Sequence, residues 1–236
     1  MLRQAMTTLF LLRHGLTAHT GRTLYGQTRG IDLDHRGRSQ AEHLAARLAP
    51  VRPTAIYSSP LERCVQTVGP LASACKLDII ERNGLIEMHA GSWTGKPISR
   101  LRRTKAWRDV QLHPEGFRFP GDGESFSEAR ERAIDELASI AKRHRRGRVV
   151  VATHGDIVRV MLADLAGAPL ARFQRIVIDT ASISVATIDR NGDPRVMLVN
   201  DTGDLRRFGA GGSSPAWETS HERSGTDRRS ERNLRG

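Results

Sequence analysis

The sequence contains 236 residues, 38% of them apolar, which suffices for one full α/β domain or for two small ones. No stretch approaches the roughly 18 to 20 consecutive apolar residues of a membrane-spanning helix, so we expect a soluble chain that does not insert into a membrane. Lys and Arg number 37 against 26 Asp and Glu, a formal net charge of +11. Such an excess of positive charge indicates an anionic partner, but nucleic acid, a membrane surface and a phosphorylated metabolite all fit it.

The cysteine content indicates the compartment. Cys64 and Cys75 are too few for a disulfide framework, and they lack the paired C-x-x-C spacing of a zinc or redox site. The apolar stretch at residues 8–12 becomes polar without the small-residue cleavage site of a signal peptide, which favours a first β-strand. We therefore expect a protein of the reducing cytoplasm.

Three short apolar runs rich in β-branched residues predict the centre of a sheet. They cover residues 8–12, 54–57 and 149–153, and polar or turn-forming residues bound each of them. Continuous apolar runs of this length are typical of strands that helices cover on both faces. Residues 176–188 and 196–199, separated by the turn sequence N-G-D-P, predict two further strands that end the sheet.

The spacing of apolar residues between these strands predicts four helices, over residues 37–49, 60–74, 125–144 and 158–165. Pro60 suits the first turn of the second helix, because the missing N–H of proline is not needed there. Ser125 and Glu128 form a capping box, in which each side chain satisfies a backbone N–H of the other residue. This pair predicts the start of the third helix.

The composition changes after the last predicted strand. Residues 206–236 are rich in Gly, Ser and Arg, and they carry seven Arg and no Lys against four acidic residues, a net charge of +3. A segment with so few apolar side chains does not bury enough surface to fold. We expect one domain over residues 1–205 and a basic, disordered tail over residues 206–236.

Basic side chains follow three of the predicted strands. Arg13 and His14 end the first strand, His154 follows another, and Arg63 lies in the first turn of the helix after a third. Each of them alone is more often a capped or solvated side chain. Because the carboxyl ends of parallel strands meet at one edge of a sheet, we expect them to converge there. Such a cluster of positive charge is stable when an anion occupies it, so the sequence predicts an anion site.

Four ordered motifs carry a resemblance to a known family. They are RHGLT at residues 13–17, YSSPLERCVQT at 57–67, GLIEMHAGSWTG at 84–95 and VVVATHGDIVR at 149–159. In order and spacing they resemble the histidine phosphatase superfamily, which contains the phosphoglycerate mutases and many small-molecule phosphatases. The resemblance covers residues 6–200 and implies an α/β fold, a three-layer α/β/α sandwich with a mostly parallel central sheet, as in phosphoglycerate mutases.

The same resemblance implies a role for each motif residue. His14 corresponds to the nucleophile, which forms a phosphohistidine that water then hydrolyses. Arg13, Arg63 and His154 correspond to the pocket that holds the phosphoryl oxygens, over which charge is spread in the transition state. Glu87 corresponds to the proton donor to the leaving group. A carboxyl that is protonated for one step and ionised for the next suits a mildly acidic pH optimum.

Three further residues are expected near the phosphate or the substrate. Gln27 and Ser59 resemble positions that bind phosphate or substrate in relatives. Thr20 stands where many relatives carry Asn, so either its hydroxyl replaces the amide or that contact is lost. Without the resemblance, Glu87 would be interpreted as an ordinary surface carboxylate. The resemblance, rather than any residue pattern, also suggests a homodimer.

Within this family, the sequence favours hydrolysis over phosphoryl transfer between substrates. A mutase must keep water from its phosphohistidine and usually carries a longer insertion after the glutamate motif than residues 94–124 provide. We therefore predict a phosphatase that acts on small phosphomonoesters and resembles acid phosphatases. Basic residues of the 94–124 segment, with Trp107, Phe117 and Phe119, are expected to form a lid over the substrate. Phosphoryl transfer of the phosphoglycerate mutase type is the alternative.

Other phosphate chemistries fit the sequence less well. Neither Cys64 nor Cys75 is followed by the Arg that a cysteine-dependent phosphatase places six residues later. The D-L-D sequence at 32–34 does not follow an apolar strand and is interpreted as a loop that leads into a helix. The G-S-W-T-G-K sequence at 91–96 has three residues between its glycines, where a phosphate-binding loop has four.

A metal site is not expected. His14, His89 and His154 are accompanied by no H-E-x-x-H sequence, no Asp-rich ligand set and no C-x-x-C pair. The sequence therefore predicts a reaction without a metal ion or another cofactor.

An anion-binding or nucleic-acid-binding protein on an inactive phosphatase fold is the alternative of a different class. Two basic runs suggest it, and they consist of Arg100, Arg102, Arg103, Lys105 and Arg108, and of Lys142, Arg143, Arg145, Arg146 and Arg148. No helix-turn-helix, RNP or zinc-finger pattern accompanies them. We interpret both runs as solvated faces and expect no nucleic-acid partner.

Overall fold

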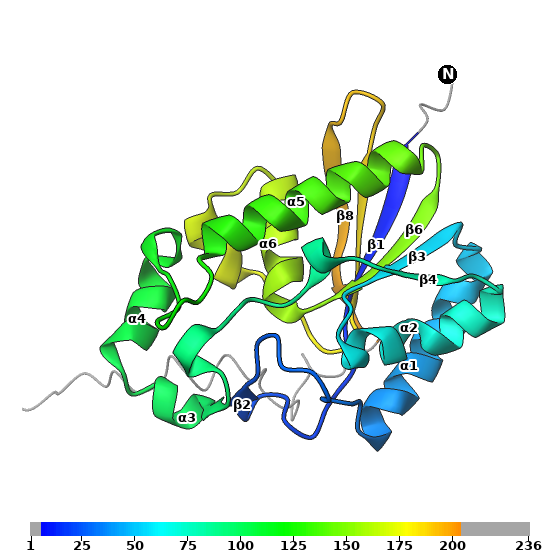
Figure 1. Ribbon diagram of the computed structural model, residues 1–236. Coiled ribbons are helices and arrows are strands. Elements are labelled where there is room, and N and C mark those ends of the chain that lie inside the picture. Colours follow the sequence, from blue (N-terminus) through cyan, green and yellow to red (C-terminus); the bar gives the residue numbers. More distant parts are fainter. Residues whose placement is uncertain (1–5, 204–236) are drawn as a thin grey trace, which may run out of the picture. The chain divides into compact units, whose positions relative to one another are not determined.

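A computed structural model of the chain describes residues 6–203 (Figure 1). The described residues up to Thr202 form one compact unit. The predicted boundary after residue 205 and the predicted tail, residues 206–236, lie outside the described residues. Within residues 6–203, no helix is both long enough and apolar enough to cross a membrane.

Six strands form the central sheet, in the order β4-β3-β6-β1-β7-β8. The strands are β1 (Thr7–Arg13), β3 (Ala55–Ser58), β4 (Ile79–Glu81), β6 (Arg148–Thr153), β7 (Ile183–Ile188) and β8 (Pro194–Asp201). β4, β3, β6 and β1 are parallel, whereas β7 is antiparallel to β1 and to β8. The predicted mostly parallel sheet is confirmed.

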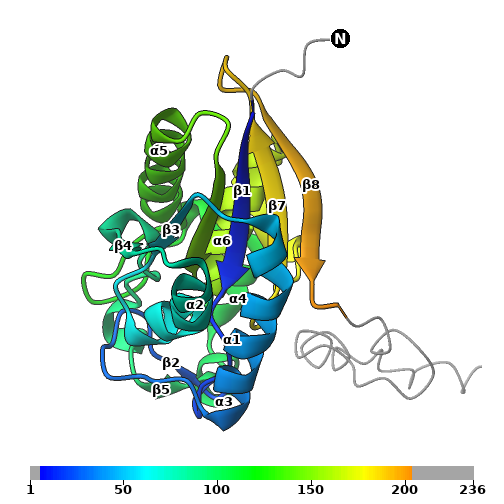
Figure 2. The ribbon, with the colours of Figure 1, turned by 90° about the vertical axis from the view of Figure 1, so that its right-hand side faces the viewer.

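Helices cover both faces of this sheet. The long ones are α1 (His35–Leu48), α2 (Glu62–Cys75), α5 (Phe126–Arg143) and α6 (Gly155–Leu165). Figures 1 and 2 show α1 and α2 on one side of the sheet and α5 and α6 on the other. The predicted α/β/α sandwich is therefore confirmed.

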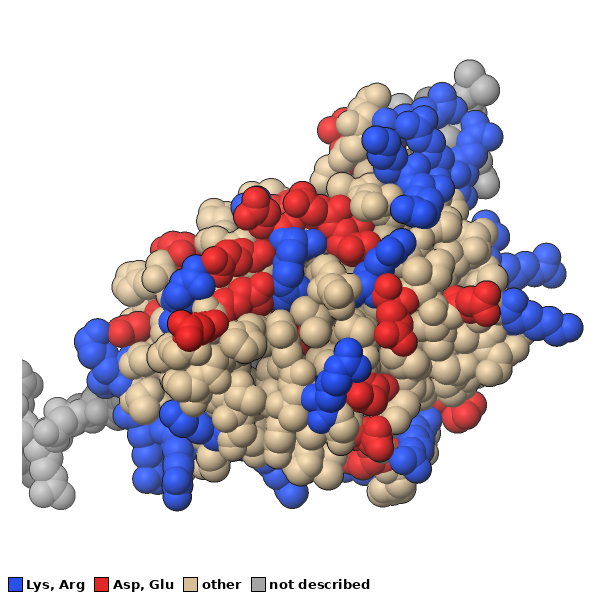
Figure 3. Space-filling view, viewed as in Figure 1, with Lys and Arg blue, Asp and Glu red and all other residues tan. Residues whose placement is uncertain are grey.

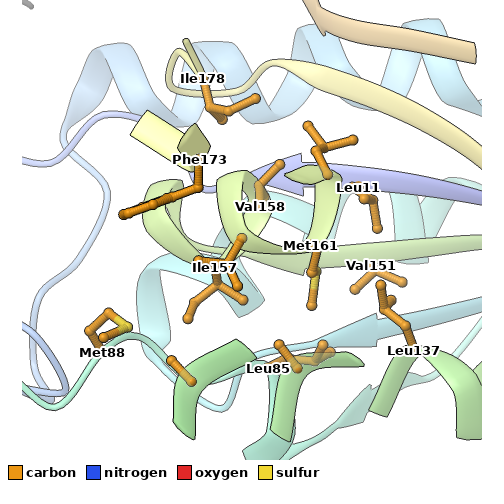
Figure 4. Packing of buried hydrophobic residues seen from close by; sticks show 14 of the residues in the cluster. Leu11, Leu85, Met88, Leu137, Val151, Ile157, Val158, Met161, Phe173 and Ile178 are labelled. Atoms are coloured by element: carbon orange, nitrogen blue, oxygen red, sulfur yellow. The ribbon is translucent and has the colours of Figure 1, made fainter. Parts of the chain in front are cut away.

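The two hydrophobic cores explain why the central strands are apolar along their whole length. Successive side chains of a strand point to opposite faces of the sheet. Leu9 and Leu11 of β1 belong to the core beneath α5 and α6, and Leu12 belongs to the core beneath α1 and α2. Figure 4 shows the first of these cores, in which Leu11 and Val151 from neighbouring strands pack beside side chains of the helices. Each such buried side chain contributes about 1.5 to 3 kcal/mol.

The start of α5 agrees with the capping box predicted at Ser125. The Ser125 hydroxyl accepts a hydrogen bond from the Glu128 backbone N–H at 3.2 Å, and the Glu128 carboxylate accepts one from the Ser125 N–H at 2.8 Å. Both bonds satisfy N–H groups that have no partner inside the helix.

Replacing Ser125 by Ala is expected to lower the free energy of unfolding by about 1 kcal/mol, because the helix loses its side-chain cap. Urea unfolding of the wild type and of the Ser125→Ala variant measures this difference in the free energy of unfolding. Ser127→Ala, an exposed position inside the same helix, is the matched control and should leave stability nearly unchanged. Equal stabilities of the two variants would contradict the role given to the cap.

Two predicted elements differ from the structure. Pro60 lies outside the first turn of α2, because the helix begins at Glu62 with Leu61 as its N-cap. The strand predicted from residue 176 begins only at Ile183, whose partner on β1 is Leu12. Residues 176–182 form no strand, and the Ala181 N–H donates to the carbonyls of Arg13 and His14 where β1 ends.

Several short elements were not predicted from the sequence. They are β2 (Thr23–Leu24), β5 (Lys96–Pro97), α3 (Ile98–Leu101) and α4 (Lys105–Leu112), besides the edge strand β4. β2 and β5 form a separate two-stranded antiparallel sheet. Short 3-10 turns connect the larger elements, at Ala49–Val51, Asn83–Leu85, Gly91–Trp93, Pro114–Gly116 and Leu170–Arg175.

Candidate active site

The carboxyl ends of three parallel strands meet at one edge of the sheet, as the sequence predicts. Arg13 at the end of β1 is opposite Thr153 at the end of β6, and Ser58 at the end of β3 is opposite Ala152. The residue after each strand therefore lies at the same edge. The rings of His14 and His154 are in edge-to-face contact there, with 5.3 Å between their centroids.

His14 is buried and prepared to act as a neutral ring. Its Nδ1 lies 2.8 Å from the carbonyl oxygen of Gly15, which only accepts hydrogen bonds, so Nδ1 carries the proton. Burial, followed by the charges of Arg13 and Arg63, holds the pKa of His14 well below its usual value. The ring therefore stays neutral, and its Nε2 keeps a free lone pair.

Two guanidinium groups, one partly buried and one buried, act on this ring through their charge. Arg13 donates from Nη1 to the carbonyl of Ile178 at 2.7 Å, and its Nε has no hydrogen-bond partner among the described residues. Arg63, only 4% exposed, donates from Nη2 to the carbonyl of Gly26 at 2.8 Å. Burial, and then the nearby charge of Arg159, lower the pKa of Arg13. Because buried positive charge is costly, this arrangement favours the binding of an anion.

His154 is fully buried beside these groups. Its Nε2 lies 2.8 Å from the Ser59 hydroxyl, and its Nδ1 lies 3.8 Å from a carboxylate oxygen of Glu87. Burial, and then Arg63 and His14, hold the pKa of His154 well below its usual value. Ser59 thus lies within hydrogen-bond distance of His154, and its predicted role in substrate binding stays a prediction.

Glu87 brings a carboxyl group to the same edge. Its neighbours Leu85 and Met88 are buried in the core beneath α5 and α6, where Figure 4 labels them. One carboxylate oxygen accepts a hydrogen bond from the Met88 N–H at 2.9 Å. Burial, and then the charge of Asp156, raise the pKa of Glu87 to about 7. A carboxyl with this pKa can both give and take a proton near neutral pH.

Gln27 and Thr20 make contacts that the resemblance does not specify. The Gln27 side-chain amide donates to the backbone carbonyl of Glu87 at 2.8 Å. The Thr20 hydroxyl lies 3.0 Å from the Thr17 hydroxyl and accepts from the Thr17 N–H. Both side chains therefore support loops of the site, and their binding of phosphate stays a prediction.

Cys64 lies against the site without taking part in it as a nucleophile. Its Sγ is 3.5 Å from Nε2 of His154. Burial raises the pKa of the Cys64 thiol to about 12, so the thiol stays protonated. The attacking form of cysteine is the thiolate, so the protonated thiol agrees with the prediction against a cysteine-dependent phosphatase.

Residues around Glu87 that the sequence analysis did not select complete the site. Asp156 and Arg159 lie on the first turns of α6, where Nη1 of Arg159 donates to Oδ1 of Asp156 at 2.8 Å. The charges of both act on Arg13, and that of Asp156 also acts on Glu87. Arg132 of α5 and Glu124 contact the backbone on either side of Glu87. Asp156 and Arg159 fall inside a recognised motif, whereas in the sequence Arg132 resembles an ordinary helix-surface charge and Glu124 an ordinary loop charge.

The aromatic residues expected in a lid pack mainly against one another. Trp93 lies 6.0 Å from Trp107, 5.5 Å from Phe117 and 5.4 Å from Phe119, measured between ring centroids. Phe119 also contacts Phe126 at the start of α5. These rings fix the segment that carries α3 and α4 to the core. Selection of substrates by this segment stays a prediction.

The basic runs lie in two places. Figure 3 shows positive side chains gathered at the upper right, where α5 ends and β6 begins, and at the lower left, near α3 and α4. The run at residues 142–148 ends at the first residue of β6, whereas His154 follows the last residue of this strand. This run therefore lies at the edge of the sheet opposite to His14. The part of the chain that the structure describes holds no group of three or more His, Cys, Asp or Glu suited to a metal ion.

Comparisons with known proteins show the family to which the chain belongs. Residues 9–202 match the sequence profile of the histidine phosphatase superfamily, branch 1. The chain is 31% identical over 216 residues to phosphoserine phosphatase 1 of Hydrogenobacter thermophilus, covering 86% of this chain and 96% of the relative. It is 35% identical over 161 residues to the metal-independent phosphoserine phosphatase of Arabidopsis thaliana, covering 66% and 67%.

Solved structures share the fold. Mycobacterial glucosyl-3-phosphoglycerate phosphatase Rv2419c superposes with a TM-score of 0.74 at 25% identity, over 84% of this chain and 100% of that one. YhfR of Bacillus stearothermophilus superposes with a TM-score of 0.76 at 28% identity, over 84% and 98%. The similarity thus extends over the whole sheet and the helices that cover it.

Proposed function

Because this chain belongs to the histidine phosphatase superfamily, we propose that it hydrolyses phosphomonoesters through a phosphohistidine formed on His14, with Glu87 as the proton donor. The resemblance seen in the sequence motifs is confirmed, and the chain is a histidine phosphatase. One observation carries the proposal for the residues. A neutral, buried His14 with a free Nε2 lies at the sheet edge, within the electrostatic influence of the partly buried Arg13 and the buried Arg63.

In the first step, the Nε2 lone pair of His14 attacks phosphorus while the bond from phosphorus to the ester oxygen breaks. Arg13, Arg63 and His154 hold the non-bridging oxygens, which carry the charge of the transition state. The Glu87 carboxyl gives its proton to the departing oxygen, so the product leaves as an alcohol. The enzyme then holds a phosphohistidine and an ionised Glu87.

In the second step, water attacks the phosphohistidine. Ionised Glu87 takes a proton from the water as its oxygen bonds to phosphorus, and the bond from Nε2 to phosphorus breaks. Inorganic phosphate leaves, and His14 and Glu87 return to their starting forms. A pKa of about 7 suits Glu87 to both steps, so we propose an optimum between mildly acidic and neutral pH, as in an acid phosphatase.

The substrate is proposed to be a small phosphorylated metabolite. Relatives that match most of this chain act on phosphoserine and on glucosyl-3-phosphoglycerate, as their names state. The +11 formal charge of the chain favours such anions. Binding of nucleic acid at the basic runs is not part of the proposal.

The compartment and the assembly are proposals as well. Cys64 and Cys75 are free thiols, which supports a reducing cytoplasm. The exposed apolar side chains of Met197, Leu198 and Val199 on the edge strand β8 support a homodimer, because an open strand edge can pair with another chain.

The test of the function is phosphate release from a panel of phosphomonoesters, including phosphoserine and 3-phosphoglycerate, at pH 5 to 8 with a chelator present. Rapid alkaline quenching of the same reactions preserves the phosphohistidine for detection. Phosphate release with a phosphorylated intermediate is expected. An intermediate that passes its phosphoryl group to a second substrate, and not to water, would instead show the mutase alternative.

A further inference from the structure

An arginine of α5 holds the segment that carries Glu87. We propose that Arg132, paired with Glu124, is a positioning residue that fixes the Glu87 backbone so that its carboxyl reaches the departing oxygen. The inference rests on the proposed role of Glu87 as proton donor. It gives a function to two charged residues that take no part in the proposed chemical steps.

The guanidinium group of Arg132 binds the backbone carbonyls of this segment. Its Nη1 donates to the carbonyls of Gly84 at 3.0 Å and Ile86 at 2.7 Å, and its Nη2 donates to that of Glu87 at 3.2 Å. These carbonyls lie in a turn and a loop after β4, where no strand ladder pairs them. Partly buried carbonyls need a donor, and the planar fork of arginine supplies several at fixed angles.

Glu124 completes the arrangement on the other side of Glu87. Its carboxylate accepts from Nε of Arg132 at 2.6 Å and from Nη2 at 2.9 Å, which is a bidentate ion pair. The same carboxylate accepts from the His89 N–H at 3.2 Å, and the Glu124 N–H donates to the His89 carbonyl at 2.8 Å. The pair is largely shielded from water, with 23% of the Arg132 side chain and 13% of the Glu124 side chain exposed.

Two further contacts leave the backbone of Glu87 little freedom. The Gln27 amide donates to the same Glu87 carbonyl that Arg132 binds, from the opposite loop. A Cβ placed on Gly84 would lie 2.7 Å from Cβ of Glu136, one turn after Arg132 on α5, so the segment is pressed against this helix. With its backbone held on two sides, the Glu87 carboxyl is placed by contacts that do not themselves touch the substrate.

The test compares leaving groups. An alkyl phosphate needs a proton on its departing oxygen, whereas p-nitrophenyl phosphate releases a stable phenolate and needs none. The parameter kcat/KM reports the steps up to phosphohistidine formation, so it isolates proton donation to the leaving group. A displaced Glu87 should therefore damage turnover of the alkyl ester selectively.

We expect Arg132→Gln to lower kcat/KM for phosphoserine roughly 100-fold, and that for p-nitrophenyl phosphate less than threefold, because small misplacement of a catalytic group has effects of this size. Glu124→Gln should also lower kcat/KM for phosphoserine more than kcat/KM for p-nitrophenyl phosphate, by a smaller factor. This variant tests the proposal if Arg132→Gln does not fold. Arg130→Gln is the matched control, since Arg130 lies on the same helix but pairs with Asp164. It should leave both substrates unaffected.

The Arg132→Lys variant shows whether the effect of Arg132 depends on the shape of its guanidinium group or only on its positive charge. An ammonium keeps the positive charge but not the fork, so the loss for phosphoserine should persist. Full recovery in Arg132→Lys, or equal losses for both substrates in Arg132→Gln and Glu124→Gln, would overturn the proposal. Failure of the proposed function is distinguishable from failure of this inference. If Glu87 is not the proton donor, Glu87→Gln lowers kcat/KM equally for phosphoserine and for p-nitrophenyl phosphate.

Discussion

His14→Ala is expected to abolish phosphate release, lowering kcat by roughly 10⁴-fold or more, because the only proposed nucleophile is lost. No neighbouring group replaces it. The pKa of Cys64 is raised to about 12, and the ring of His154 lies within hydrogen-bond distance of Ser59. The measurement is steady-state phosphate release with the substrate on which the wild type is most active. The phosphorylated intermediate should disappear together with turnover.

The control for this variant is His43→Ala. His43 lies exposed on α1, away from the strand ends, and its loss should leave kcat unchanged. Both variants should unfold at temperatures close to that of the wild type, which ensures that lost activity is not lost structure. A His14→Ala variant that still forms a phosphoenzyme would show that another residue is the nucleophile.

Glu87→Gln is expected to lower kcat/KM for an alkyl phosphomonoester by about 10² to 10⁴-fold, since the amide cannot give up a proton to the departing oxygen. With p-nitrophenyl phosphate the loss should stay below roughly tenfold, because that leaving group needs no proton. Parallel assays of the two substrates measure the difference. Glu42→Gln, an exposed carboxylate on α1, is the control and should change neither value.

The pH dependence of kcat/KM in the wild type should reveal the titration of Glu87. Burial raises the pKa of Glu87 to about 7, and the protonated form is the acid, so kcat/KM for an alkyl ester should fall as pH rises through 7. The pKa of His14 is held well below 6.5, so His14 stays neutral and causes no fall between pH 6 and 7. In Glu87→Gln the decline near pH 7 should be absent. An unchanged decline would assign it to a different group.

Features set by neighbours along the chain were predicted well. Continuous apolar runs identified β1, β3 and β6, since each of these strands is covered on both faces. The capping box placed the start of α5 correctly, because its hydrogen bonds join residues three positions apart. The sequence motifs alone indicated His14, Arg63, Glu87 and His154 as one set.

Features set by distant parts of the chain were not predictable in this way. The two-residue strands β2 and β5 exist only because they pair with each other, and the strand predicted from residue 176 begins only at Ile183, opposite Leu12 near the end of β1. Arg132 is an ordinary helix-surface charge in sequence, and its contacts with the Glu87 segment arise only where α5 meets that segment.

The sequence by itself indicated the residues proposed to carry the chemistry. The basic ones stood out because they follow apolar strands, whereas Glu87 was indicated only by the resemblance of its motif. Only the tertiary structure decided how those groups behave. The raised pKa of Glu87 and the lowered pKa of His14 arise from burial and from charges on other elements, which come together only when the sheet forms. Local chain patterns encode strands, caps and motifs, whereas burial and long-range contacts set the protonation and the position of each proposed catalytic group.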